Sequence, residues 1–284
     1  MLIAWIAICA AILVGVAIFL NRLQGWWGHV AVFIGIPALL LAYWMQPGSN
    51  VAAGTFGYLK FVSVCIGGAL ISGLRFRNWA DKHGWRLVAY LVLFINILEA
   101  VGFEILDVMI STPEQSFGGS LLNAGAGALL LLTQAYPRFI TVNRDDARNP
   151  LEYDLGVGWV LAYVVWNFTF VYGTIPPETQ PGQWAAFAIV HLLPPLLLMG
   201  GNGARFIQAR TYTLPFAMAL YITNPGAPWL PVAENWHSPQ IALALGAVAL
   251  LMTVATAVMM WRGRPAGEAP RTLLESLLGK LVKG

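Results

Sequence analysis

Residues 87–109 read LVAYLVLFINILEAVGFEILDVM, an apolar stretch that nevertheless carries three carboxylates. An apolar helix needs about 20 residues to cross about 30 Å of hydrocarbon, and this stretch is long enough. Ionisable groups at membrane depth are costly and by default mark a functional position. The stretch therefore predicts a membrane-spanning helix and indicates where a site should be sought.

The whole chain shares this apolar character. Of its 284 residues, 58% are hydrophobic and only 10% are charged, with a mean hydropathy of +0.68. A typical soluble domain carries about 25% charged residues. The composition therefore excludes a disordered protein, a nucleic-acid-binding protein and an ordinary cytosolic enzyme.

The spacing of apolar stretches predicts an all-α fold, a polytopic transmembrane helix bundle over residues 1–263. About nine stretches reach or approach the length of a span. Eight spans are the alternative, because Pro215 interrupts one short stretch. The expected spans are 2–20, 27–46, 56–74, 87–108, 118–136, 156–175, 184–201, 207–223 and 240–261.

The basic residues predict the orientation. With nine spans, every Lys and Arg except Lys60 falls on one side, which the positive-inside rule makes cytoplasmic. We therefore expect a cell inner (cytoplasmic) membrane protein with its N-terminus outside, its C-terminus cytoplasmic and the lipid bilayer as its surroundings. Within the tail, residues 264–284, leucines recur at helical spacing and predict an interfacial amphipathic helix. They are Leu273, Leu274, Leu277, Leu278 and Leu281.

Polar residues at membrane depth are the candidate site. On the stretch 87–109, one helical stripe holds Asn96, Glu99, Phe103 and Asp107, with Glu104 at its edge. Glu99 is the first choice for binding an ion or proton. The alternative is a carboxylate that simply hydrogen-bonds neighbouring spans, or an Asp107 that reaches water.

Other expected spans add further polar groups. Lys60 either extends to the outer headgroups or pairs with a carboxylate of 87–109. Two consecutive prolines, Pro194 and Pro195, are expected to break the helix that carries His191. The remaining candidates are Asn123, Tyr163, Trp166, Asn167 and Asn224. By depth, these groups favour one polar pocket that opens outward, although Asn residues also serve as interhelical contacts.

Several kinds of site find no support in the sequence. The four histidines are scattered, so there is no signature of a haem or zinc site, and no nucleotide-binding motif is present. No cofactor follows from the residues. Cys9 and Cys65 are expected to be buried structural thiols. Residues 138–154 are expected to form a solvated connector, with a gating loop as the alternative.

Four segments resemble a family of bacterial multi-pass membrane proteins known as a domain of unknown function. The likeness runs from the second expected span to the ninth and implies a multi-pass inner-membrane protein, without an activity. The segments are Asn96-Ile-Leu-Glu99-Ala, Asn123-x-Gly125, Ala162-Tyr163-x-x-Trp166-Asn167-Phe168-x-x-Val171-Tyr172 and Arg210-Thr-x-x-Leu.

Three functions fit these features. We expect first a transporter of a small polar solute or cation, coupled through an intramembrane carboxylate. The second is an intramembrane enzyme acting on a lipid or isoprenoid, in which Glu99 or Asp107 serves as the acid–base group, His191 assists and Trp166 stabilises a cation. The third is a non-catalytic membrane subunit or binding module. The residues favour a non-enzymatic role, and they leave the oligomeric state open.

Overall fold

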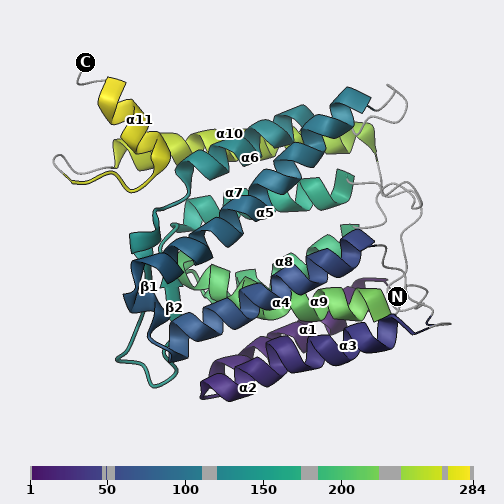
Figure 1. The fold of residues 1–284 in the computed structure, drawn as a ribbon. Coiled ribbons are helices and arrows are strands. Elements are labelled where there is room, and N and C mark those ends of the chain that lie inside the picture. The colour runs from purple at the N-terminus through teal and green to yellow at the C-terminus, as the bar shows by residue number, and fades with distance from the viewer. Residues whose placement is uncertain are drawn as a thin grey trace. The chain divides into compact units, whose positions relative to one another are not determined.

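The structure is a computed structural model that describes residues 2–46, 49, 55–110, 120–173, 185–223, 238–263 and 268–281. Figure 1 shows that the described residues are mostly helical. The chain divides into two compact units. Unit 1 consists of Met1–Ala89, Ile140–Tyr153 and Ile189–Pro231, and unit 2 consists of Tyr90–Phe139, Asp154–Ala188 and Val232–Gly284.

Unit 1 is built from helices and a small hairpin. The helices of its first segment are α1 (Leu2–Arg22), α2 (Trp26–Val30), a π-helical turn (Ala31–Gly35), α3 (Ile36–Trp44), α4 (Thr55–Phe76), a 3-10 turn (Trp79–Asp81) and the start of α5 (His83–Ile110). Its later elements are β1 (Ile140–Val142), β2 (Leu151–Tyr153), most of α8 (Ala185–Met199), a 3-10 turn (Gly203–Arg205) and α9 (Phe206–Thr223).

In unit 1, α4 packs against α9 and α2, and α9 also packs against α1. Two glycines of α4 allow aromatic rings to approach its backbone. A Cβ added at Gly68 would lie 2.2 Å from the Phe33 ring, and one at Gly73 would lie 2.1 Å from the Trp79 ring. Only glycine fits at these positions, because interiors are close-packed.

The described residues of unit 2 contain the rest of α5, the first residues of α8 and four further helices. They are α6 (Ser120–Thr133), α7 (Val157–Gly173), α10 (Pro239–Arg262) and α11 (Leu273–Leu281), with a 3-10 turn at Pro137–Phe139. Helix α10 begins with an N-cap, since the Ser238 hydroxyl accepts a hydrogen bond from the Ile241 amide. Pro239 follows in the first turn, where proline is favoured.

In unit 2, α6, α7 and α10 pack against one another. The buried face of α10 carries only small residues, which let helices approach closely in an apolar surrounding. They are Ala242, Gly246, Ala249, Thr253, Thr256 and Ala257. This close packing brings α6 and α7 together, and both helices contribute to the site described below.

Among the described residues, five helices are long and apolar enough to cross a membrane: Ile3–Arg22, Trp26–Trp44, Gly57–Phe76, His83–Leu106 and Pro239–Arg262. Many of their large apolar side chains are exposed, among them Ile3 at 82% and Leu39 at 73%, as expected of a membrane protein. The predicted spans 118–136, 156–175 and 184–201 correspond to shorter apolar helices, each of which borders residues outside the described part. The span expected at 207–223 corresponds to α9.

One local expectation is wrong, and a second is incomplete. Helix α8 runs from Ala185 to Met199 without a break, with Pro194 and Pro195 inside it. A membrane helix tolerates proline where its surroundings satisfy the freed backbone groups, and both prolines are buried. Most of the connector 138–154 is exposed or half-buried, as predicted, but it also has regular structure. It contains the antiparallel hairpin β1–β2, in which Ile140 pairs with Tyr153 and both are buried.

Candidate functional site

The interior of unit 2 contains a carboxylate, that of Glu104, which is only 7% exposed. Asn123 Nδ2 donates to Glu104 Oε1 at 2.5 Å and also to the carbonyl oxygen of Trp166 at 3.2 Å. Because Glu104 is on α5, Asn123 on α6 and Trp166 on α7, one amide group links three helices. Asn123 is fully buried, so these bonds form away from water.

Two buried polar atoms of this cluster have no hydrogen-bond partner among the described residues: Asn123 Oδ1 and Trp166 Nε1. One is an acceptor and the other a donor. Buried polar groups are nearly always paired, so an unpartnered donor and acceptor beside a carboxylate need an explanation. We call Glu104, Asn123 and Trp166 the unit 2 cluster.

Aromatic rings on α7 extend away from the cluster. Tyr163 is 5.6 Å from Trp166 and 5.4 Å from Trp159, and Phe170 is 6.3 Å from Trp166 on the other side, measured between ring centroids. Tyr163 and Trp166 are both buried. Such rings are rigid and fix the orientation of the Trp166 indole.

The buried face of α5 differs from the stripe favoured by the sequence. Ile97, Ala100, Val101 and Glu104 are buried, whereas Phe103 is 45% exposed. Asn96 and Glu99 are half-buried. The structure therefore brings together Glu104, Asn123 and Trp166 of the predicted candidates, and makes Glu104 rather than Glu99 the carboxylate of the cluster.

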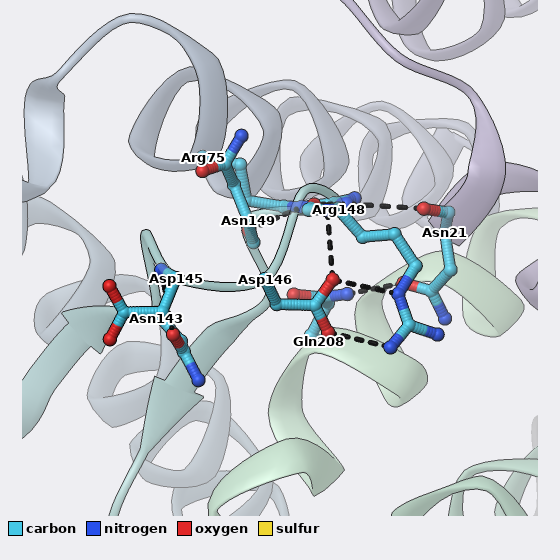
Figure 2. Close-up of polar contacts among 8 residues, drawn as sticks. All are labelled: Asn21, Arg75, Asn143, Asp145, Asp146, Arg148, Asn149 and Gln208. Atoms are coloured by element: carbon cyan, nitrogen blue, oxygen red, sulfur yellow. Dashed lines mark hydrogen bonds and ion pairs between the residues drawn. The ribbon is translucent and has the colours of Figure 1, made fainter.

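Unit 1 contains a second polar cluster, centred on Arg75 at the end of α4 (Figure 2). Arg75 is fully buried. Its Nε donates to the Asn149 carbonyl at 3.1 Å, its Nη2 to the Arg148 carbonyl at 2.5 Å, and its Nη1 to the Tyr212 hydroxyl at 2.5 Å. These partners are neutral oxygens, so dipoles rather than a counter-charge stabilise the guanidinium.

Arg75 thereby holds the loop between β1 and β2 against α4 and α9. The loop needs a left-handed residue at Asn149, where φ is 46°. Gln208 of α9 accepts a hydrogen bond from the Leu151 amide at 2.5 Å and donates to the Asn21 side chain. Several helices therefore meet at the base of this hairpin.

An ion pair at the exposed side of the loop joins Asp146 and Arg148 at 2.6 Å (Figure 2). Hydrogen bonds from the Arg148 side chain and amide lower the pKa of Asp146 from 3.8 to about 2. The stability that this pair contributes is present above about pH 4 and is lost only as the pH falls toward 2. The loop is therefore insensitive to pH changes near neutrality through this pair.

A model of a family of unknown function, DUF5692, matches residues 1–268, most of the chain. The chain belongs to the DUF5692 family. No curated protein and no solved structure matches its sequence. The resemblance to a family of unknown function is thus confirmed, and the match includes every residue of both polar clusters. Helix α11 lies beyond it.

In this DUF5692 member, the other predicted site residues are divided between the two units. Lys60 and His191 belong to unit 1, whereas Asn96, Glu99 and Asn167 belong to unit 2. His191 Nδ1 lies 3.0 Å from Arg210 Nη1, and both side chains are buried. Asn167 is buried and Lys60 half-buried. The side chain of Asp107 and all of Asn224 lie outside the described residues.

Sequence reasoning missed Arg75 and Arg210 as site residues. Both count among the basic residues from which the sequence predicts a cytoplasmic side, although Arg75 lies in the last turn of α4 and Arg210 near the start of α9. The sequence does mark Arg210, because Gln208 and Arg210 are two polar residues close together at the start of the predicted span 207–223. Within the described residues, no three His, Cys, Asp or Glu side chains lie close enough to hold a metal ion.

Proposed function

We propose that this protein is a membrane transporter for a small polar solute or cation, and that Glu104 binds the coupling cation or proton. The observation that carries the proposal is the buried Glu104–Asn123 pair, together with an unpartnered acceptor on Asn123 and an unpartnered donor on Trp166, whose carbonyl Asn123 also binds. A carboxylate buried in an apolar helix bundle is costly unless it is protonated or paired with a cation. Exchange between these states is the chemistry that a coupled transporter needs.

The remaining atoms of the unit 2 cluster suit a polar solute. Trp166 Nε1 supplies a donor, and Asn123 Oδ1 supplies an acceptor. A solute carrying both a hydroxyl or amide hydrogen and a carbonyl or ether oxygen would satisfy both. The rigid Trp166 ring would then select by shape, since small-molecule sites combine apolar walls with a few placed polar groups.

An electrical measurement tests this proposal through the coupling cation, so the solute need not be identified first. Proteoliposomes adsorbed on a sensor are exposed to jumps in Na⁺, K⁺ or H⁺ concentration. We expect a charge-displacement current for at least one of these cations, because binding to Glu104 moves charge within the membrane. Glu104→Gln should abolish the current.

The matched control is Glu275→Gln. Glu275 is also a buried carboxylate of unit 2, but it accepts a hydrogen bond from the Arg271 amide at the start of α11. This variant should keep the current. The proposal fails if wild type gives no current with any of the three cations, or if Glu104→Gln leaves it unchanged.

We further propose nine spans in the inner membrane, with the N-terminus outside and the C-terminus cytoplasmic. The support is the charge distribution, in which Lys60 alone falls on the outer side. A C-terminal green fluorescent protein fusion should be fluorescent, and a C-terminal alkaline phosphatase fusion should be inactive. The opposite pair of results would reverse the orientation.

A further inference from the structure

Helix α11 begins with a local cap and is joined through Ser276 to the segment that follows α6. The Thr272 hydroxyl accepts a hydrogen bond from the Glu275 amide at 3.2 Å, and the Glu275 carboxylate accepts one from the Arg271 amide at 2.8 Å. These bonds form a reciprocal cap at the start of the helix. The Ser276 hydroxyl also bonds the Tyr136 hydroxyl at 2.8 Å.

The segment before α11 is attached as well. The Tyr136 amide donates to the Arg271 carbonyl at 2.8 Å, and Arg271 forms an ion pair with Asp154 at 2.5 Å. Arg138 donates to the Pro270 carbonyl at 2.6 Å. The direction in which α11 presents its outer face is therefore set by the fold of unit 2.

That outer face is apolar. Leu273, Leu277 and Leu281 follow one another at four-residue intervals and are 37%, 45% and 76% exposed. Lys280 is exposed at the edge of the same face, while Glu275 on the opposite side is buried. The five leucines expected to form one apolar face are thus divided, since Leu274 and Leu278 are half-buried.

The position of α11 indicates what covers this face. Helix α10, one of the five long apolar helices, ends at the exposed Arg262, and α11 begins at Leu273 soon after (Figure 1). An apolar stripe bordered by a lysine, close to the end of a membrane-spanning helix, has the composition of a helix that lies in a lipid interface. Cations in that position are attracted to anionic headgroups.

We propose that the Leu273–Leu277–Leu281 face of α11 inserts into the interface of an anionic bilayer, with Lys280 at the headgroups. The attachments described above hold the helix in register for this contact. The inference is independent of transport, because it concerns a helix that contributes nothing to the unit 2 cluster.

Spin labelling of the full chain in nanodiscs tests it. Cys9 and Cys65 are replaced by alanine, and a nitroxide is attached to Leu277→Cys. Leu39→Cys, on an exposed face of α3, provides the lipid reference, and Asp145→Cys, in the exposed loop, provides the water reference. In discs containing phosphatidylglycerol, the label at 277 should be as accessible to oxygen as the label at 39. It should be less accessible to a water-soluble nickel chelate than the label at 145.

Changing the lipid headgroups tests whether the positive charge of Lys280 contributes to the binding of α11 to the bilayer. Shielding at 277 should weaken in purely zwitterionic discs and with Lys280→Glu. Nickel accessibility at 277 equal to that at 145 in both kinds of disc would overturn the proposal. Spin–spin broadening at 277 in discs that hold two copies would also overturn it, because a second copy of the chain would then cover the face.

Discussion

Replacing Arg75 with glutamine is expected to lower the free energy of unfolding by about 3 kcal/mol or more. The guanidinium supplies hydrogen bonds to the Asn149 and Arg148 carbonyls and to the Tyr212 hydroxyl. Each buried acceptor that loses its donor costs about 1–3 kcal/mol, and glutamine cannot reach all three. In thermal unfolding followed by tryptophan fluorescence, the midpoint should fall by roughly 6–12 °C.

Arg77 provides the matched control, since it lies two residues later and is exposed. Arg77→Gln should change the midpoint by little, because exposed charges contribute little to stability. Arg75→Lys should resemble Arg75→Gln, because a lysine lacks the planar set of donors that serves three separate oxygens. Equal midpoints for Arg75→Gln and Arg77→Gln would show that the buried guanidinium does not hold the hairpin.

Gly127→Ala is expected to destabilise unit 2 and to disturb its polar cluster. An added Cβ would lie 2.4 Å from Val101 Cγ2 and 2.7 Å from Trp166 Nε1. Overpacking typically costs about 1–3 kcal/mol, and it outweighs the helix-propensity gain of about 1 kcal/mol from replacing glycine. The displaced indole should also reduce the cation-dependent current.

Gly125→Ala isolates the steric part of this effect, because it makes the same substitution on the same helix. Its Cβ would meet only Leu250 Cδ1, at 3.7 Å, an ordinary contact. This variant should unfold at the wild-type midpoint or slightly above it and should keep the current. If both alanine variants behave alike, the close approach of Trp166 to α6 is not a constraint.

Hydrophobic length was sufficient to predict most helices. The stretches containing α1, α4, α5 and α10 exceed the length of a span, and a run of such length has few alternatives to a helix in a membrane. The Ser238-Pro239 start of α10 was also readable in principle, as a cap followed by a first-turn proline. The sequence does not predict that α8 continues through Pro194 and Pro195, because this depends on the neighbours that surround α8.

The choice of carboxylate required the structure. Glu99 and Glu104 are five residues apart, so they point in directions that differ by more than a right angle around the helix. Sequence pattern selected the stripe with the most polar residues, which carries Glu99. Packing selected the direction that faces α6, where Asn123 meets Glu104.

The burial of Arg75 is another feature that the sequence does not predict. Arg75 and Arg77 contribute equally to the orientation that the sequence predicts, yet Arg75 is fully buried and Arg77 is exposed. The oxygens that Arg75 binds come mainly from the hairpin loop, more than 70 positions later in the chain. A pairing between such distant backbone groups leaves no periodic pattern in the sequence.

Infrared difference spectroscopy of the purified protein tests most directly whether Glu104 exchanges a proton or cation within the membrane. Spectra recorded between acid and neutral pH, with and without Na⁺ or K⁺, should contain a carboxyl C=O band that responds to pH or cation. That band should be missing in Glu104→Gln and retained in Glu275→Gln. A spectrum that Glu104→Gln leaves unchanged under all these conditions would contradict the account.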